Sequence, residues 1–144
     1  MESKKRFFAS PQDVEAAFYD ALQRADLDAM MEVWAEDEEI VCVHPGGPRL
    51  SGYAVVQESW RQIFSGPQRL KIQLSHQVYL QGLLLSVHSV HENISVVGER
   101  APPQAMVATN VYLRGAQGWR MLVHHSSPAP VTTEVAGDGP KTLH

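Results

Sequence analysis

The chain has 144 residues, of which 44% are apolar, and its net charge is −4 with neutral histidines. Length and composition predict one soluble globular domain with its own core. The 12 Lys and Arg residues form no long basic run, which argues against nucleic acid as a partner. No stretch approaches the roughly 20 apolar residues of a membrane helix, and residues 1–12 lack the apolar core of a secretory signal. We therefore expect a cytoplasmic protein that binds neither nucleic acid nor membrane.

The first half of the chain carries helical patterns. Ser10-Pro11 is typical of a helix start, and apolar side chains then recur every three or four residues from Val14 onward. Asp26 is placed to cap a second, short helix. A short strand is expected over about residues 39–44, because a Pro-Gly-Gly sequence follows it. Helical periodicity then returns and ends at Gly66-Pro67, which predicts a third helix.

After Pro67 the apolar period changes from about 3.6 to 2, which is typical of half-buried strands. The expected strands cover about residues 70–80, 83–96, 104–114 and 118–126. We divide the chain into an N-terminal arm (1–9), one domain (10–128) and an irregular tail (129–144). Helices that precede a run of strands predict an α+β domain, with three helices packed on one face of a curved, mostly antiparallel sheet. The uncovered face favours self-association.

Three segments resemble the SnoaL-like, or nuclear-transport-factor-2-like, superfamily, which includes ketosteroid isomerase. They read FYDALQRADLDAMMEVWAEDEEIVCVHPGG, LSGYAVVQESWRQIF and ATNVYLRGAQGWRMLVHHSSP, and the last is most similar to an uncharacterised SnoaL-like branch. The resemblance implies a cone-shaped, cystatin-like fold, a pocket between helices and sheet, and a homodimer across the outer sheet face. It does not imply a reaction, because this superfamily combines enzymes, binding modules and assembly domains. The strand aspartate that ketosteroid isomerases use as a base has no counterpart in the strands after Gly66.

The last two strands flank the sequence GAQG, and a two-residue turn at Ala116-Gln117 would fix their pairing. With that turn, the numbers of facing residues sum to 233, so that Tyr112 faces Met121 and Ala108 faces His125. The predicted inner face then carries Trp119, Met121, Val123 and His125 from the last strand, together with Asn110 and Tyr112. The predicted outer face, and with it the dimer interface, carries Arg120, Leu122 and His124 together with Thr109, Val111 and Leu113. A one-residue bulge in this hairpin would exchange the two faces.

His125 and Asn110 are therefore the candidate catalytic residues. The candidate ligand-binding residues are polar or aromatic: His44, Tyr53, Trp34, Trp60, Tyr112, Trp119 and Glu92. Each has a structural alternative. The aromatic residues can belong to the core, His125 can be a buried, hydrogen-bonded core histidine, and His44 can simply end a strand. Asn110 can be a buried amide with a partner, and Glu92 can be a solvated or paired acid. Neighbouring histidines such as His124 and His125 point to opposite faces of a strand, which argues against a metal site. We expect no metal and no cofactor.

Three functions are consistent with this sequence. The first is binding of a small, largely apolar molecule in the cone cavity. The second is acid–base catalysis of the isomerase, cyclase or dehydratase type, with His125 as proton shuttle and Asn110 or Tyr112 holding an oxyanion. The third is dimerisation without catalysis. A cavity with converging polar atoms favours the first two functions, whereas a filled cone favours the third.

Overall fold

The start of the first helix follows the expected capping chemistry. Ser10 Oγ accepts a hydrogen bond from the backbone N–H of Asp13 at 3.1 Å, and Pro11 occupies the first helical position. The helix α1 (Pro11–Arg24) ends at Ala25, whose left-handed backbone (φ 53°) turns the chain. Asp26 then caps α2 (Leu27–Glu32) by accepting from the N–H of Ala29 at 3.0 Å. The sequence therefore predicted both helix starts correctly.

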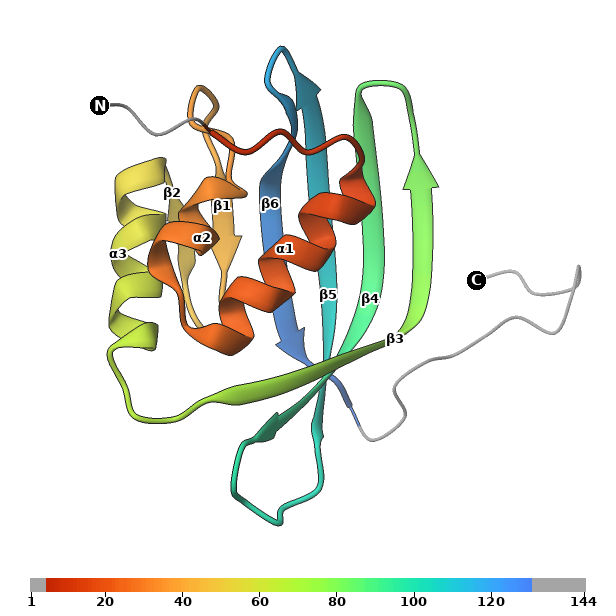
Figure 1. Cartoon of the computed structure of the whole chain (residues 1–144). Coiled ribbons are helices and arrows are strands. Elements are labelled where there is room, and N and C mark those ends of the chain that lie inside the picture. The colour runs from red at the N-terminus through yellow and green to blue at the C-terminus, as the bar shows by residue number, and fades with distance from the viewer. Residues whose placement is uncertain (1–4, 131–144) are drawn as a thin grey trace, which may run out of the picture.

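The computed structural model describes residues 5–130, which form three helices and one six-stranded sheet (Figure 1). The third helix is α3 (Tyr53–Phe64), and the strands are β1 (Val41–Val43), β2 (Arg49–Ser51), β3 (Leu70–Gln81), β4 (Leu85–Val96), β5 (Gln104–Gly115) and β6 (Gly118–Pro128). Their order across the sheet is β2-β1-β6-β5-β4-β3. Only the β1–β6 pair is parallel among these strands. The α+β class, the three helices and the curved, mostly antiparallel sheet are confirmed.

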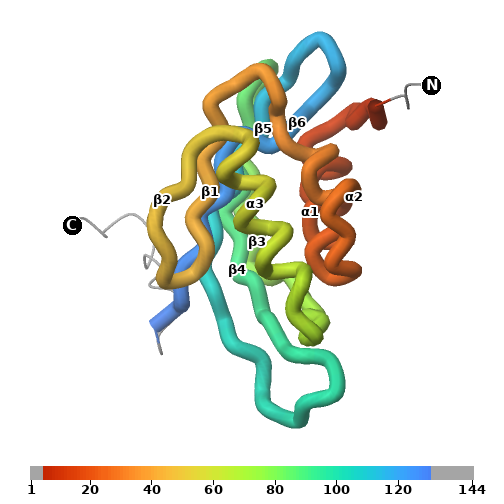
Figure 2. The backbone as a smooth tube through the Cα atoms, turned by 90° about the vertical axis from the view of Figure 1, so that its left-hand side faces the viewer, coloured from red at the N-terminus to blue at the C-terminus, as the bar shows by residue number. Residues whose placement is uncertain are grey.

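The helices lie on one face of the sheet, and the opposite face of the described chain carries none (Figures 1 and 2). The strand β3 sweeps below α1 towards the end of α3, so the sheet curls around the helices. Residues 131–144 of the expected C-terminal tail lie outside the described residues. Within residues 5–130 we find no helix that is long and apolar enough to cross a membrane.

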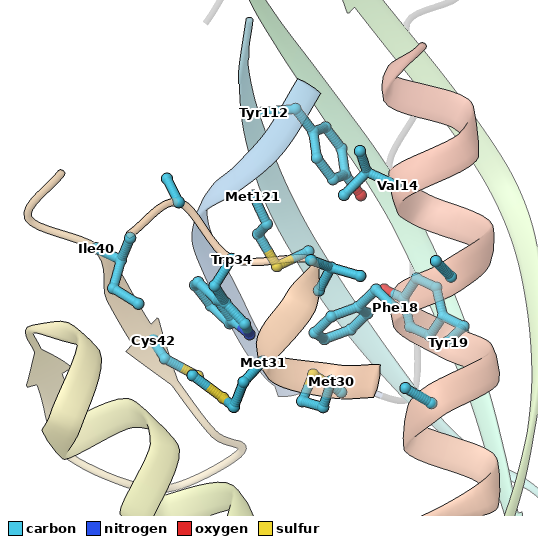
Figure 3. Packing of buried hydrophobic residues seen from close by; sticks show 14 of the residues in the cluster. Val14, Phe18, Tyr19, Met30, Met31, Trp34, Ile40, Cys42, Tyr112 and Met121 are labelled. Atoms are coloured by element: carbon cyan, nitrogen blue, oxygen red, sulfur yellow. The ribbon is translucent and has the colours of Figure 1, made fainter. Parts of the chain in front are cut away.

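The interior of the cone is filled mainly by large side chains (Figure 3). Phe18 of α1 packs edge-on against Trp34 and Trp60, with ring centroids 6.4 and 5.7 Å apart. Tyr112 and Met121 of the sheet complete this cluster and are fully buried. Trp34 and Tyr112, which we expected to line a pocket, therefore belong to the core. The cone is closed over much of its length.

The N-terminal arm contributes to this core. Phe8 is 2% exposed, and its carbonyl oxygen accepts a hydrogen bond from the backbone N–H of Trp119 at 2.9 Å. Next to it, Met121 N–H donates to the Val33 carbonyl at 2.7 Å. These segments cover the free edge of β6 beyond the end of β1, where its polar backbone would otherwise remain unpaired. Part of the expected arm is thus an integral element of the domain.

The final hairpin departs from the expected pairing at one position. From Arg114↔Trp119 to Tyr112↔Met121 the numbers sum to 233, as predicted. The next pair is Val111↔Val123, so Leu122 is an extra residue in β6 and forms a β-bulge.

Beyond the bulge the expected faces of the β6 residues are exchanged, whereas Asn110 and Tyr112 of β5 stay on the inner face. Asn110 now faces His124, and Thr109 faces His125. His124 is 2% exposed on the inner face, whereas His125 is exposed on the outer face. The predictions that His125 lies inside and that His124 contributes to the outer face are both wrong. The reason is that one inserted residue inverts the side-chain alternation of the rest of the strand.

The approach of the arm to β6 yields a stability prediction. Gly118 has φ +90°, and a Cβ there would lie 2.6 Å from the carbonyl oxygen of Phe8. Gly98 has nearly the same φ, +91°, but nothing lies within 4 Å of its Cβ position. We expect Gly98→Ala to lower the free energy of unfolding by about 1 kcal/mol through backbone strain alone. Gly118→Ala should cost about 2 kcal/mol more because it also displaces Phe8.

Chemical denaturation of the two variants and the wild type measures both effects. Equal losses for the two variants would contradict the close packing of the arm against β6.

Candidate functional site

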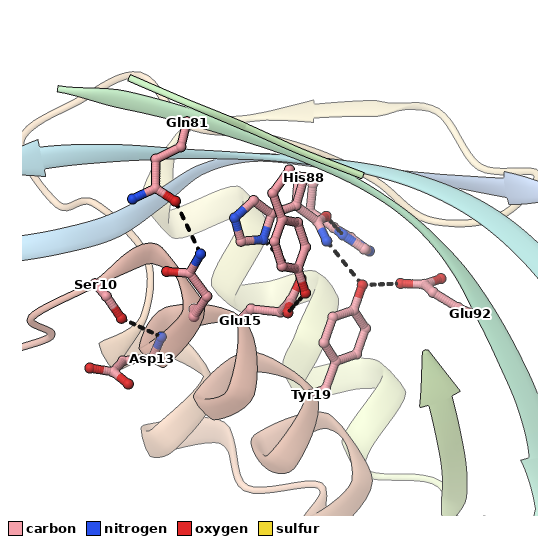
Figure 4. Close-up of polar contacts among 11 residues, drawn as sticks. Ser10, Asp13, Glu15, Tyr19, Gln81, His88 and Glu92 are labelled. Atoms are coloured by element: carbon pink, nitrogen blue, oxygen red, sulfur yellow. Dashed lines mark hydrogen bonds and ion pairs between the residues drawn. The ribbon is translucent and has the colours of Figure 1, made fainter. Parts of the chain in front are cut away.

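A continuous chain of buried hydrogen bonds links α1 to the inner face of three adjacent strands. Tyr19 of α1 donates its hydroxyl proton to Glu92 Oε2 at 2.6 Å (Figure 4). Asn110 Nδ2 donates to the same Tyr19 oxygen at 2.9 Å. Asn110 Oδ1 in turn lies 2.6 Å from His124 Nδ1. Ser126 Oγ donates to the other carboxylate oxygen of Glu92 at 2.7 Å. We call Tyr19, Glu92, Asn110, His124 and Ser126 the polar chain.

The register of the sheet explains why these side chains meet. His88 and His124 both pair with Asn110, and Ser126 pairs with Ala108, so their side chains share the inner face. Glu92 lies four residues along β4 from His88 and has the same orientation. Tyr19 reaches this row from α1, in the turn after Glu15. Because every member is buried, each polar atom in the chain needs a neighbouring member as its hydrogen-bond partner.

Burial shifts the pKa values of His124 and Glu92 in the polar chain. It lowers the pKa of His124 to about 3, with smaller contributions from the charges of His44 and His125. Burial also raises the pKa of Glu92, although the hydrogen bonds from Ser126 and Tyr19 act in the opposite direction. His124 is therefore a neutral imidazole at neutral pH. Within residues 5–130 its hydrogen bond is made through Nδ1, which fixes the ring and leaves Nε2 for another partner.

A cavity of about 190 Å³ lies beside the polar chain. Its apolar walls come from α1, α3 and the curved part of the sheet: Leu22, Trp60, Ile63, Leu70, Ile72 and Ile94. Its polar walls are His44, Glu92, His124 and Ser126. Ile63 is 44% exposed, so the cavity opens towards solvent beside α3. The arrangement is an apolar cavity with polar atoms concentrated on the sheet side.

His44 occupies the end of β1 next to this cavity. Its Nε2 lies 3.0 Å from Ser59 Oγ on α3. Its ring packs edge-on against the Trp60 ring, with the centroids 4.7 Å apart. Burial lowers the pKa of His44, which favours the neutral ring. The neighbouring Cys42 thiol has a pKa raised to about 12 by burial, so it remains protonated. The interpretation of Cys42 as a small buried hydrophobe fits this position.

The structure places the other expected site residues as follows. His44, Trp60 and Glu92 line the cavity, and Asn110 stands behind it as the partner of His124. Tyr53 instead donates to the Met31 carbonyl at 3.0 Å and does not line the cavity. The remaining three, Trp34, Tyr112 and Trp119, are buried in the core.

Three residues of the polar chain were not predicted as site residues from the sequence. Ser126 shares a face with His124, so a correct register would have identified it. Tyr19 lies on the apolar face of α1, where a tyrosine is easily interpreted as core. His124 was assigned to the wrong face. Within residues 5–130 no three His, Cys, Asp or Glu side chains come together as possible metal ligands.

A second buried polar cluster lies nearer the start of α1. Glu15 accepts hydrogen bonds from Tyr79 at 2.8 Å and from His88 Nδ1 at 2.9 Å (Figure 4). The ring of His88 also stacks on Tyr79 at 3.9 Å. Glu15 thus anchors α1 to β3 and β4. It does not line the cavity.

The sequence model of a SnoaL-like domain matches residues 12–132 of this chain. The chain belongs to the SnoaL-like family. A structure from Thiobacillus denitrificans, provisionally named a calcium/calmodulin-dependent protein kinase type II association domain, is 38% identical with a TM-score of 0.77, covering 87% of this chain and 99% of that one. A provisionally named dehydratase of the NTF2-like family from Streptomyces avermitilis is 30% identical with a TM-score of 0.75, covering 82% and 92%.

A curated relative is a longer protein than this chain. The F-box protein SKIP8 of Arabidopsis thaliana is 27% identical over 126 residues, which cover 85% of this chain and 52% of that protein. This SnoaL-like chain therefore spans about half the length of the curated relative. An NTF2-like protein of unknown function from Pseudomonas putida shares the fold at 16% identity with a TM-score of 0.74.

The burial of His124 predicts a dependence of stability on pH. An unfolded histidine titrates near 6.5 and folded His124 near 3, so the unfolded state binds more protons between these values. The folded state therefore loses stability as pH falls from about 6.5, by up to ~1.4 kcal/mol per pH unit from this group. His124→Gln, whose amide can still donate to Asn110, should remove this contribution to the slope.

The matched control is His125→Gln, at the neighbouring, exposed side chain. Denaturation between neutral pH and pH 4 should give the wild-type slope for this variant. If the free energy of unfolding depends less on pH in His125→Gln than in His124→Gln, then His125 and not His124 is the buried histidine.

Proposed function

We propose that this SnoaL-like domain binds a small, largely apolar molecule in the cavity beside the polar chain. The observation that carries the proposal is the position of His124, whose ring lines the cavity and is fixed there through Asn110. A buried polar chain that ends at a cavity wall presents one oriented polar atom to an otherwise mostly apolar space. Such a combination is typical of small-molecule sites.

The size of the cavity limits the ligand. An engineered apolar cavity of about 150 Å³ holds one benzene molecule, so the 190 Å³ of this cavity suit a one-ring or short branched molecule. A polycyclic ligand would need several side chains to move. With so few contacting atoms, an affinity in the millimolar to micromolar range is expected for an unelaborated one-ring molecule.

One relative is consistent with a small-molecule site in this fold. The Streptomyces avermitilis protein is provisionally named a dehydratase. An acid–base role for His125 in this chain is contradicted by its exposed position on the outer face. Binding through His124 requires no such proton transfer and is consistent with a neutral imidazole.

The cavity opens beside Ile63, so blocking that opening tests directly whether ligands bind inside. Nuclear magnetic resonance should show toluene, anisole or phenol shifting the methyl signals of Leu22, Ile72 and Ile94 at millimolar concentration. Ile63→Trp should abolish these shifts, because the indole would fill the opening. Val55→Trp is the control, since Val55 is similarly exposed on the same helix (50% against 44% for Ile63) but does not line the cavity. Absence of shifts with all three probes would contradict binding in this cavity.

We also propose that the outer sheet face mediates a homodimer. The register aligns five apolar side chains in one row across adjacent strands: Val41, Val123, Val111, Val87 and Leu80. No described helix covers this face, and Leu80 is 65% exposed. A continuous apolar row in water is typical of an interface, and a second copy presents the same row. The structure at 38% identity is provisionally named an association domain, which is consistent with self-association.

A charge in the middle of this row should separate the two copies. We expect the wild type to be a dimer at micromolar concentration by light scattering, and Val111→Lys to be a folded monomer. Gln57→Lys adds the same charge on the exposed side of α3 and should remain dimeric. A monomeric wild type would exclude the proposed interface.

A further inference from the structure

We infer that the cavity selects a ligand that supplies the hydrogen-bond donor, such as a neutral hydroxyl group on a one-ring body, and that it rejects anions. This inference rests on the proposed binding function and specifies the ligand. It follows from tracing every side-chain proton on the polar wall of the cavity. Each of these protons is already used within the protein.

The proton of His124 lies on Nδ1. Asn110 Nδ2 donates to Tyr19, whose own proton goes to Glu92, so the oxygen of the Asn110 amide faces His124. An amide oxygen only accepts hydrogen bonds, and His124 Nδ1 must therefore donate. In a neutral ring this leaves Nε2 without a proton. His124 offers the cavity a lone pair.

The proton of His44 lies on Nε2. Ser59 Oγ donates its single proton to the Val56 carbonyl at 2.7 Å, as serine commonly does within a helix. The same oxygen can then only accept from His44 Nε2, which lies 3.0 Å away. The unprotonated atom of His44 is Nδ1. His44 too has only an acceptor left for a ligand.

Glu92 and Ser126 are the other two polar residues of the wall, and they also face a ligand as hydrogen-bond acceptors. The proton of Ser126 is directed to Glu92 Oε1, so Ser126 Oγ can only accept from a ligand. Burial raises the pKa of Glu92, but both of its oxygens accept hydrogen bonds, from Ser126 and Tyr19, and these bonds oppose the rise. The indole N–H of Trp60, on the apolar wall, is buried without a hydrogen-bond partner among the described residues. The four polar side chains of the wall thus present no free donor.

An acceptor-only wall has a defined specificity. A hydroxyl group can donate to His124 Nε2, whereas an ether of the same size leaves that nitrogen without a partner. A carboxylate or an enolate would bring negative charge beside Glu92 with no donor to stabilise it, which is costly in a partly closed site. The same wall lacks the donors of an oxyanion hole. The cavity is therefore suited to holding an alcohol or phenol.

Phenol, anisole and benzoate form a matched set of probes for this inference. We expect phenol to bind about tenfold more tightly than anisole, which corresponds to roughly 1.4 kcal/mol for one hydrogen bond. Benzoate should bind more weakly than either. Benzylammonium, tested beside them, distinguishes a neutral donor from a cationic one, and it should bind less tightly than phenol because its charge must be desolvated. Titration calorimetry or methyl chemical shifts give the four affinities.

The outcomes separate the inference from the proposed function. Anisole equal to phenol, or benzoate or benzylammonium tighter than phenol, overturns the ligand class while the cavity remains a binding site. Loss of all binding overturns the proposed function and the inference with it. In His124→Phe, which keeps a ring but removes the acceptor, phenol should fall to the affinity of anisole. Unchanged phenol affinity in this variant would also overturn the inference.

A second measurement needs neither ligand nor variant. Nitrogen chemical shifts of the imidazole rings in the wild-type protein at neutral pH distinguish protonated from unprotonated nitrogens. We expect His124 to carry its proton on Nδ1 and His44 on Nε2. A proton on His124 Nε2 would give the cavity a donor and would contradict the inference directly.

Discussion

The β-bulge at Leu122 determines which side chains of β6 reach the interior. Before the bulge, Trp119 and Met121 point inward and pack with the core, and the arm around Phe8 covers the edge of the strand. After it, His124 and Ser126 point inward instead of Val123 and His125. One additional residue thus replaces Val123 and His125 with His124 and Ser126 on the inner wall, at the same end of the cone where β1 pairs with β6.

Burial of this polar wall is tolerated because the members of the polar chain satisfy one another's hydrogen-bonding groups. Asn110 uses both ends of its amide, one for Tyr19 and one for His124, and so joins α1 to β6 through β5. Truncating a member would leave its neighbours buried without partners, at a cost of about 1–3 kcal/mol for each. The chain also orients one nitrogen of His124 towards the cavity. Structural and recognition roles therefore depend on the same hydrogen bonds.

The filled part of the cone explains why the cavity is small. Phe18, Trp34, Trp60 and Tyr112 occupy space that an open cone would leave for a ligand, whereas the end between α3 and the curved strands remains open. Among relatives that share this fold, an association domain and a dehydratase are both named. How far aromatic side chains fill the cone, and which polar atoms remain beside the open end, are properties of each sequence and not of the fold.

The sequence by itself determined the order of elements apart from the short strand β2, both helix caps, the change of apolar period after Pro67 and the α+β class, because these depend on local capping and on alternation along the chain. It also identified His44, Trp60, Glu92 and Asn110 as unusual polar or aromatic positions. Tertiary structure alone decided which histidine faces the cavity, because a bulge is a property of the pairing between two strands and leaves no signal in the alternation of one. It likewise brought Tyr19 to Glu92 across 73 residues, a contact that no local pattern encodes.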